Sequence, residues 1–206
     1  MAEEQEERNE NEERVIVVPG EKVPSTVRGN AYRRNNETYS EVYGLMTKRG
    51  EFAKIVPLTG PYIPVEGDYV VGIVTDVKFG GCVVDINSPY TAFLPTKREY
   101  NYKDVVFAKV DKVDEVKNVV LFDEKKLFQG EVIDVSPVKV PRIIGKKNSM
   151  INLVKELTGC LIFVGRNGRI WIKGENYAKA AQAIRKIESE AHTSGLTERV
   201  TELLKH

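Results

Sequence analysis

The stretch IIGKKNSMI, from Ile143 to Ile151, combines residue types that suit contact with phosphate. Gly145 and Asn148 tolerate the left-handed backbone of a tight loop better than most residues do. Lys146 and Lys147 place two positive charges in that loop, directly before a segment with helical spacing. Positive charge at a helix start favours anions. We therefore predict a tight phosphate-contacting loop; the alternative is a loop that only supports the fold.

The surroundings of this loop are basic. Arg142 adds a third positive charge, and residues 139–154 contain no acidic residue. Residues 125–206 hold 15 basic and 8 acidic residues, a net charge of +7, whereas residues 1–14 hold seven Glu and two Arg, a net charge of −5. The two regions nearly cancel in the formal net charge of +1. This asymmetry indicates that the C-terminal third meets a polyanion or, alternatively, presents a solvated basic face.

The sequence offers little for catalysis or metal binding. Cys82 and Cys160 fit no metal-ligand spacing, so we predict buried thiols in a reducing, cytoplasmic compartment. His192 and His206 lie in a polar stretch and are expected to be exposed. We find no metal cluster, nucleophile–histidine pair or P-loop, and no apolar run of membrane-spanning length. The sequence therefore predicts no enzyme, no cofactor and no membrane partner.

Helical segments flank the loop. VPRIIG before it predicts a short helical turn. SMINLVKELT after it predicts a helix that Asn148 or Ser149 caps and Gly159 ends. Four apolar residues of this helix fall on one face, namely Met150, Ile151, Val154 and Leu157.

Strands and a last helix complete a C-terminal α/β domain over residues 125–206. A strand is expected at Gly130–Val135, and two more flank Asn167-Gly168, a strong hairpin signal. The predicted order is strand, helix, tight loop, helix, strand, hairpin, strand, helix. The remaining assignments are strands at Leu161–Val164 and Arg169–Lys173, a helix from about Glu175 that turns Ala180, Ala183, Ile184 and Ile187 inward, and a linker at Glu124–Lys126.

Residues 65–124 predict a five-stranded barrel of the OB type. Five short strands with one longer connection match this fold, whose strands 2 and 3 and adjacent loops bind oligonucleotides. The alternative is a barrel used for protein contact. The strands are expected at Val70–Val77, Cys82–Ile86, Thr91–Leu94, Val105–Val113 and Val119–Phe122, with a bend at Phe79-Gly80-Gly81 and a polar connection at Lys97–Lys103.

Barrel side chains supply further candidates for RNA contact. Phe79 and Phe93 could stack on bases or equally belong to the core. Lys78, Lys97 and Arg98 surround the same expected surface and suit phosphate, although surface lysines often contact nothing specific.

The N-terminal part is expected to be separate. Residues 1–14 combine low hydrophobicity with high charge, which predicts a disordered acidic tail. Residues 15–64, with short strands near VIVVPGEKV, Tyr39–Leu45 and Phe52–Leu58 and frequent glycine and proline, predict a small all-β domain.

These segments resemble known RNA-binding modules. IIGKKNSMI resembles the GxxG loop of a K-homology (KH) domain, with Asn148 in place of the second glycine. The barrel resembles the S1 domain, whose FG bend matches Phe79-Gly80; Cys82 and Pro95 replace a common aromatic residue and histidine. Together with the N-terminal module that begins VVPGE and the stretch GRNGRIW, the order of these modules along the chain resembles that of the exosome RNA-binding cap subunit, the ribosomal RNA-processing protein four family. The resemblance runs from Val15 to about Ile187.

The resemblance implies a non-catalytic subunit. Such a cap docks, in several copies, on a ring of ribonuclease-PH-like subunits through its N-terminal domain and guides single-stranded RNA into the pore, where the ring performs the phosphorolysis. It also implies that Gly165, Asn167 and Gly168 are structural or make subunit contacts; Trp171 is expected in a core or an interface. The alternatives are a free RNA-binding factor of transcription or translation, and an enzyme like polynucleotide phosphorylase, whose catalytic core this sequence lacks.

Overall fold

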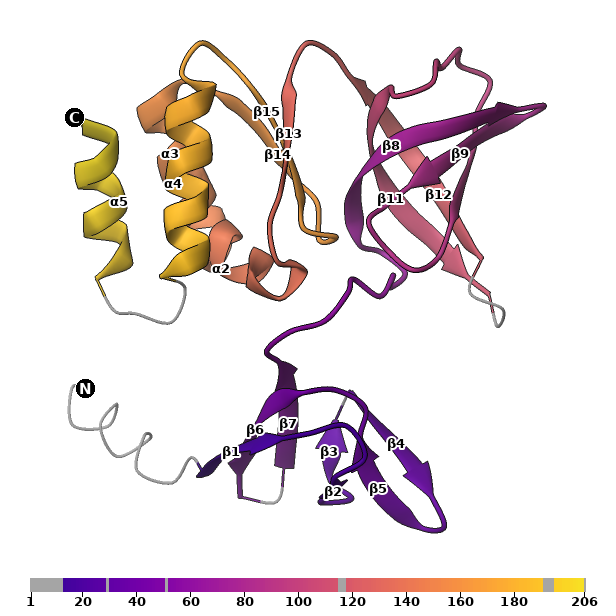
Figure 1. The fold of residues 1–206 in the computed structure, drawn as a ribbon, viewed down its shortest axis with the longest axis vertical. Helices are drawn as coiled ribbons and strands as arrows, with labels where there is room; N and C mark the ends of the chain where they lie inside the picture. The colour runs from indigo at the N-terminus through magenta and orange to yellow at the C-terminus, as the bar shows by residue number, and fades with distance from the viewer. Residues whose placement is uncertain (1–12, 29, 51, 115–117, 191–194, 206) are drawn as a thin grey trace. The chain divides into compact units, whose positions relative to one another are not determined.

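The computed structural model describes residues 13–205 except 29, 51, 115–117 and 191–194 (Figure 1). The chain divides into two compact units, one ending at Gly60 and the other beginning at Pro61. The fold is mixed β and α+β. Most of the predicted acidic tail and both histidines lie outside the described residues, but Glu13 and Arg14 already belong to the first strand.

The N-terminal unit consists of two small sheets around a small core. Val17, Val23 and Ile55 are its buried residues. One sheet has the order β1-β6-β7-β3 and the other the order β2-β5-β4. The strands are β1 (Glu13–Val17), β2 (Lys22–Val23), β3 (Val27–Arg28), β4 (Ala31–Arg34), β5 (Glu37–Ser40), β6 (Gly44–Arg49) and β7 (Phe52–Pro57).

The second unit begins with a closed five-stranded barrel in the order β10-β12-β11-β8-β9. Parallel pairing of β10 with β12 closes it, as in the predicted OB type. The predicted linker Glu124–Lys126 was wrong, because Lys125 and Lys126 pair with β11 inside a continuous strand. The strands are β8 (Tyr69–Lys78), β9 (Gly81–Asp85), β10 (Ala92–Pro95), β11 (Val105–Val113) and β12 (Val119–Leu127).

The C-terminal domain has a three-stranded sheet in the order β13-β15-β14. Helices lie on one side of this sheet and the barrel on the other (Figure 1). The predicted order of elements is confirmed, and a further helix follows it. The elements are β13 (Glu131–Asp134), a 3-10 turn at Pro137–Lys139, α2 (Val140–Ile144), a second 3-10 turn at Lys146–Asn148, α3 (Ser149–Thr158), β14 (Leu161–Val164), β15 (Arg169–Lys173), α4 (Tyr177–Ser189) and α5 (Leu196–Lys205).

The helices pack on the sheet through the predicted apolar positions, with one exception. Met150, Ile151 and Val154 of α3 are buried, whereas Leu157 on the same predicted apolar face is 37% exposed. The four predicted inward positions of α4 are fully buried. Within the described ranges, no helix is long and apolar enough to cross a bilayer.

Candidate nucleic-acid interface

The loop between α2 and α3 depends on left-handed backbone. Gly145 has φ 75°, and a Cβ atom there would lie 2.8 Å from both the backbone nitrogen and the Cβ atom of Met150. Lys147 and Asn148 follow with φ 54° and 64°. Asn148 occupies the N-cap position of α3, as predicted, but in a left-handed conformation and without a side-chain hydrogen bond to the helix. The loop is therefore tight, and its shape costs conformational energy.

Three cations gather at this loop. Arg142 stands in the last turn of α2, and Lys146 and Lys147 follow directly in the 3-10 turn; all three are exposed. Lys146 and Lys147 form no ion pair with any residue that the structure describes. The structure thus brings together the loop cluster Arg142, Lys146 and Lys147, which concentrates positive charge at one exposed turn.

Asn148 should accept glycine without loss of folding. Left-handed backbone costs an L-residue about 1–2 kcal/mol, but glycine nothing, while glycine has more freedom to lose from the unfolded chain. We expect Asn148→Gly to keep the free energy of unfolding within about 0.5 kcal/mol of the parent. Asn148→Val, a β-branched control, should lower it by at least about 1 kcal/mol in urea titrations. Equal stability of the two variants would contradict a left-handed residue 148.

A second set of candidates surrounds the turn between β8 and β9. Phe79 is fully exposed at this turn, and Phe93 on β10 is 36% exposed, so neither belongs to the barrel core. The Phe93 ring lies over Gly81, where an added Cβ atom would approach its Cζ to 2.7 Å. Lys78 precedes the turn and is exposed. The turn therefore displays aromatic and cationic side chains together.

Lys97 and Arg98 lie beside the same turn. The Thr96 amide donates to the Gly80 carbonyl at 3.2 Å, which ties the start of the β10–β11 connection to the turn. Arg98 directs its Nε toward Glu124 Oε1 at 3.6 Å. Lys97 is exposed. This barrel set and the loop cluster lie on different domains.

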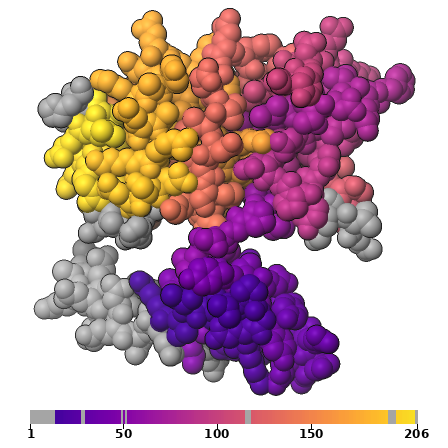
Figure 2. All heavy atoms as spheres, viewed as in Figure 1, coloured from indigo at the N-terminus to yellow at the C-terminus, as the bar shows by residue number. Residues whose placement is uncertain are grey.

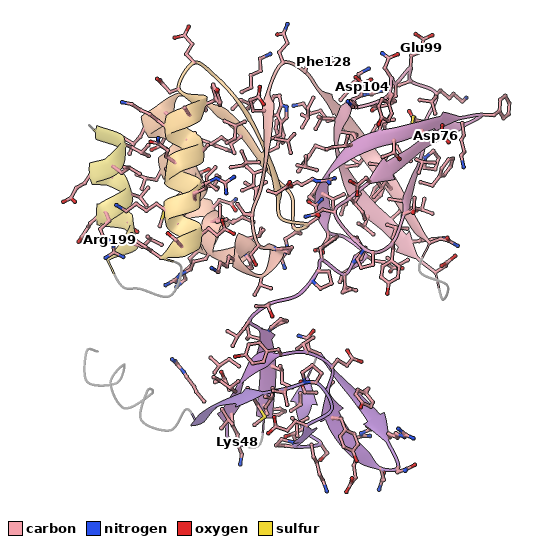
Figure 3. All side chains as sticks on the ribbon, in the orientation of Figure 1. Lys48, Asp76, Glu99, Asp104, Phe128 and Arg199 are labelled. Atoms are coloured by element: carbon pink, nitrogen blue, oxygen red, sulfur yellow. The ribbon has the colours of Figure 1, made fainter. Side chains whose placement is uncertain are left out.

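A lysine from the supposed linker organises the barrel surface. Lys126 forms an ion pair with Asp104 and donates to the Glu99 carbonyl at 3.2 Å. Its ammonium group also lies 5.0 Å from the Tyr100 ring centroid and 5.4 Å from that of Phe128. Glu99, Asp104 and Phe128 lie near the same end of the barrel (Figure 3). Lys126 therefore fixes the β10–β11 connection, a role that sequence reasoning missed because it assigned residue 126 to a linker.

This ion pair persists at neutral pH. Burial acts to raise the pKa of Asp104, but hydrogen bonds from Lys126 and the Asn101 amide, with the Lys126 charge, hold it below its ordinary value of 3.8. The stabilisation is present above the unfolded pKa and is lost only as pH falls through the lower folded pKa. Burial likewise raises the pKa of Tyr100 to about 12, so its hydroxyl stays protonated.

The GRNG hairpin joins the C-terminal domain to the barrel. Asn167 is fully buried, and its Nδ2 donates to the carbonyls of Val71 and Ile86, both at 2.8 Å. Its Oδ1 accepts from the Val71 amide at 3.2 Å. Gly165 must lack a side chain, since a Cβ atom would lie 2.1 Å from Asn167 Oδ1. The motif therefore works within the chain, as a clamp on backbone groups of the barrel.

An ion pair and an apolar cluster extend this contact, which we call the seam. Arg169 donates from Nη1 to the Asp85 carbonyl and from Nη2 to the Asp85 carboxylate, each at 2.7 Å. Trp171 is buried with Val71 and Leu127. Phe163 lies between Phe107 and Trp171, with ring centroids 5.0 and 5.8 Å away. Atoms of the barrel and the C-terminal domain meet along a continuous boundary (Figure 2).

Part of one face of the β1-β6-β7-β3 sheet presents apolar side chains, beside a polar row of Arg14, Thr47 and Lys54. Ile16 pairs with Leu45, and Leu45 pairs with Val56, so the three form a row across β1, β6 and β7. Their neighbours Val17 and Ile55 point to the core instead. A contiguous exposed apolar patch marks an interaction surface. We call it the apolar sheet face; its members are the exposed residues Ile16, Val18, Tyr43, Val56 and Leu58 and the half-buried Leu45.

The side chains that could bind a metal ion do not gather into a site among the residues that the structure describes. Among them, no group of three or more His, Cys, Asp or Glu side chains could hold a metal ion. Cys82 and Cys160 are buried and free, as predicted. The arrangement supports binding of a polyanion by exposed cations and aromatic rings.

Known proteins resemble this chain in sequence and in fold. Residues 130–177 match the KH domain family. The exosome complex component Rrp4 of Methanothermus fervidus is 42% identical over 216 residues, which cover 93% of this chain and 96% of that protein. Rrp4 of Thermococcus kodakarensis is 38% identical, covering 93% of this chain and 85% of that protein. A crystal structure assigned to an exosome complex RNA-binding protein aligns with a TM-score of 0.63 and 36% identity over 71% of this chain and 96% of that chain.

Proposed function

This chain belongs to the Rrp4 family of exosome complex components, and from that premise we propose that it is a non-catalytic RNA-binding cap subunit. It docks on a ring of ribonuclease-PH-like subunits and guides single-stranded RNA into the pore for 3′-to-5′ degradation or processing. The observation that carries the proposal is the 42% identity to an exosome component over 93% of the chain, because it spans the N-terminal sheets, the barrel and the KH domain. The buried free cysteines suit a reducing cytoplasm.

The barrel and the KH loop supply the RNA contacts. Exposed aromatic rings suit stacking of unpaired bases, and exposed lysines suit phosphate. Asn148 replaces the glycine that would let phosphate approach the backbone most closely, so the loop contributes charge more than base selection. A cap that feeds many RNAs into a pore needs such sequence-tolerant binding. The proposed contacts are Lys78, Phe79, Phe93, Lys97, Arg98, Arg142, Gly145, Lys146, Lys147 and Asn148.

The N-terminal unit supplies the docking surface. The apolar sheet face exposes Ile16 to 55% and Val56 to 43%, which costs hydration free energy in the isolated chain. A protein partner that covers this face removes these side chains from water, so binding releases that unfavourable hydration free energy. A free RNA-binding factor has no need for such a surface, so its presence favours the ring-docking function.

Capture from native lysate, with identification of bound proteins by mass spectrometry, tests this function. Ring subunits should elute with the tagged chain, and their absence would favour a free RNA-binding factor. The purified chain alone should leave RNA intact with phosphate and magnesium present, whereas the reconstituted ring degrades it. Turnover that follows the purified chain through successive columns would contradict a non-catalytic subunit.

The loop lysines should contribute to RNA affinity through charge. We expect Lys146→Ala/Lys147→Ala to weaken binding of single-stranded RNA of every sequence alike. The slope of log K against log salt should flatten by up to about 0.7 for each phosphate that the variant no longer neutralises. Filter binding over a salt series measures both quantities.

A matched control separates specific from general charge effects. Lys179→Ala/Arg185→Ala removes two exposed cations from α4 and should leave affinity and slope close to those of the parent. If the loop variant matches the parent in the free chain and in the assembled complex, the loop only supports the fold and RNA runs over the barrel.

A further inference from the structure

The connection between β10 and β11, residues 96–104, runs beside the far half of β8. Its start is tied to Gly80 through Thr96, and its end to β8 through the Lys103 amide, which donates to the Val74 carbonyl at 2.9 Å. The far half of β8, from Val74 to Lys78, spans about 13 Å at the rise of a strand. The connection therefore forms a ridge that leads from the β8–β9 turn along the barrel.

Tyr102 stands at the far end of this ridge on a well-held turn. The Asn101 amide donates to the Asp104 carboxylate at 2.6 Å, and the Asp104 amide returns a bond to the Asn101 carbonyl at 3.0 Å. Lys126 anchors the same carboxylate. Lys103 adopts a left-handed conformation with φ 68°, which an L-residue keeps only where its surroundings enforce it. This fixed turn leaves Tyr102 68% exposed.

Cations accompany the exposed ring. The Lys103 ammonium lies 5.5 Å from the centroid of the Tyr102 ring. Aromatic residues thus mark both ends of the ridge, with Phe79 at the near end. Two charged residues beside the ridge are ion-paired, Asp104 with Lys126 and Arg98 with Glu124. Of the other exposed charges along the ridge, the cations are Lys78, Lys97 and Lys103, and the acids are Asp76 and Glu99.

We propose that Tyr102 stacks on a base and that Lys103 contacts a phosphate of single-stranded RNA, so that the RNA track of the barrel extends from Phe79 along the ridge to Tyr102. Rings that alternate with cations fit a single strand, which offers unpaired base faces and a charged backbone together. The inference rests on the proposed RNA-binding function. It adds a contact on the connection between strands 3 and 4 of the barrel, whereas binding to this fold is expected on the face of strands 2 and 3 and on the loops between strands 1 and 2 and between strands 4 and 5.

Binding of labelled oligouridine by the full chain, measured over a salt series, tests the proposal. Tyr102→Ala should weaken binding by about five-fold to a hundred-fold with an unchanged salt slope, because stacking releases no counterion. Tyr102→Phe retains the ring and should bind like the parent. Lys103→Ala should flatten the slope by up to about 0.7. The control Tyr177→Ala removes a tyrosine of α4 that is 47% exposed and should change neither quantity.

The outcomes separate this inference from the function on which it rests. If the parent binds RNA and Tyr102→Ala binds equally well, the track does not reach Tyr102, although RNA binding stands. If Tyr102→Phe loses as much affinity as Tyr102→Ala, the hydroxyl group and not stacking makes the contact, and the stacking assignment fails. If the parent chain itself binds no RNA, the RNA-binding function and this inference fail together.

Discussion

Replacing Asn167 by alanine should lower the free energy of unfolding of the barrel–KH unit by about 3–5 kcal/mol. The side chain is fully buried and makes three hydrogen bonds to backbone groups of Val71 and Ile86. Alanine would leave one amide and two carbonyls unpaired in the seam, and each buried unpaired group costs about 1–3 kcal/mol. Urea titration followed by circular dichroism measures the destabilisation.

Two further variants distinguish the role of the hydrogen bonds from that of side-chain volume. Asn167→Asp keeps the volume but replaces the amide donor by an oxygen facing two carbonyls, so it should destabilise at least as much as alanine. Asn152→Ala removes an exposed asparagine from α3 and should change stability by less than about 1 kcal/mol. If Asn167→Ala costs less than about 1 kcal/mol, the barrel and the KH domain do not depend on this clamp.

The double variant Ile16→Glu/Val56→Glu should abolish capture of ring subunits. It places two carboxylates in the middle of the apolar sheet face, and docking would bury them without partners. The combined penalty should reduce affinity by about a hundred-fold or more. Because both side chains are exposed, the isolated chain should remain folded by circular dichroism and bind RNA like the parent. Capture from native lysate gives the comparison.

The matched control adds the same charges elsewhere in the N-terminal unit. Ser25→Glu/Tyr32→Glu changes two exposed residues outside the apolar sheet face and should still capture the ring. Capture by the Ile16→Glu/Val56→Glu variant at the level of this control would exclude the apolar sheet face as the docking surface.

Local patterns predicted most of the C-terminal domain from the sequence. The bounds of α3, β14 and β15 agree with helical spacing and with the Asn167-Gly168 hairpin signal, because each depends on neighbouring residues. The end of β12 was missed, since its charged outward residues look like a linker when pairing with β11 is unknown. Asn148 was predicted at the cap position of α3 and lies there, but its left-handed backbone and its lack of a capping hydrogen bond were not foreseen.

The residue types of the candidate site could be predicted from the sequence, but their arrangement in space could not. The loop cluster lies close in sequence, so its basic character was visible. The seam was not, because Asn167 bonds to residues 96 and 81 positions earlier in the chain. Tyr102 was overlooked within a polar connection, since only the fold shows which loop residues stay exposed beside β8.

The burial of Trp171 gives the chain a built-in optical probe. It is the only tryptophan of the sequence and lies in the seam, 2% exposed, beside Val71 and Leu127. Indole emission depends on the polarity of its surroundings, so separation of the two domains would shift the emission to longer wavelength without any label. The protein can therefore report on its own seam while RNA binding is followed independently by a dye on the oligonucleotide.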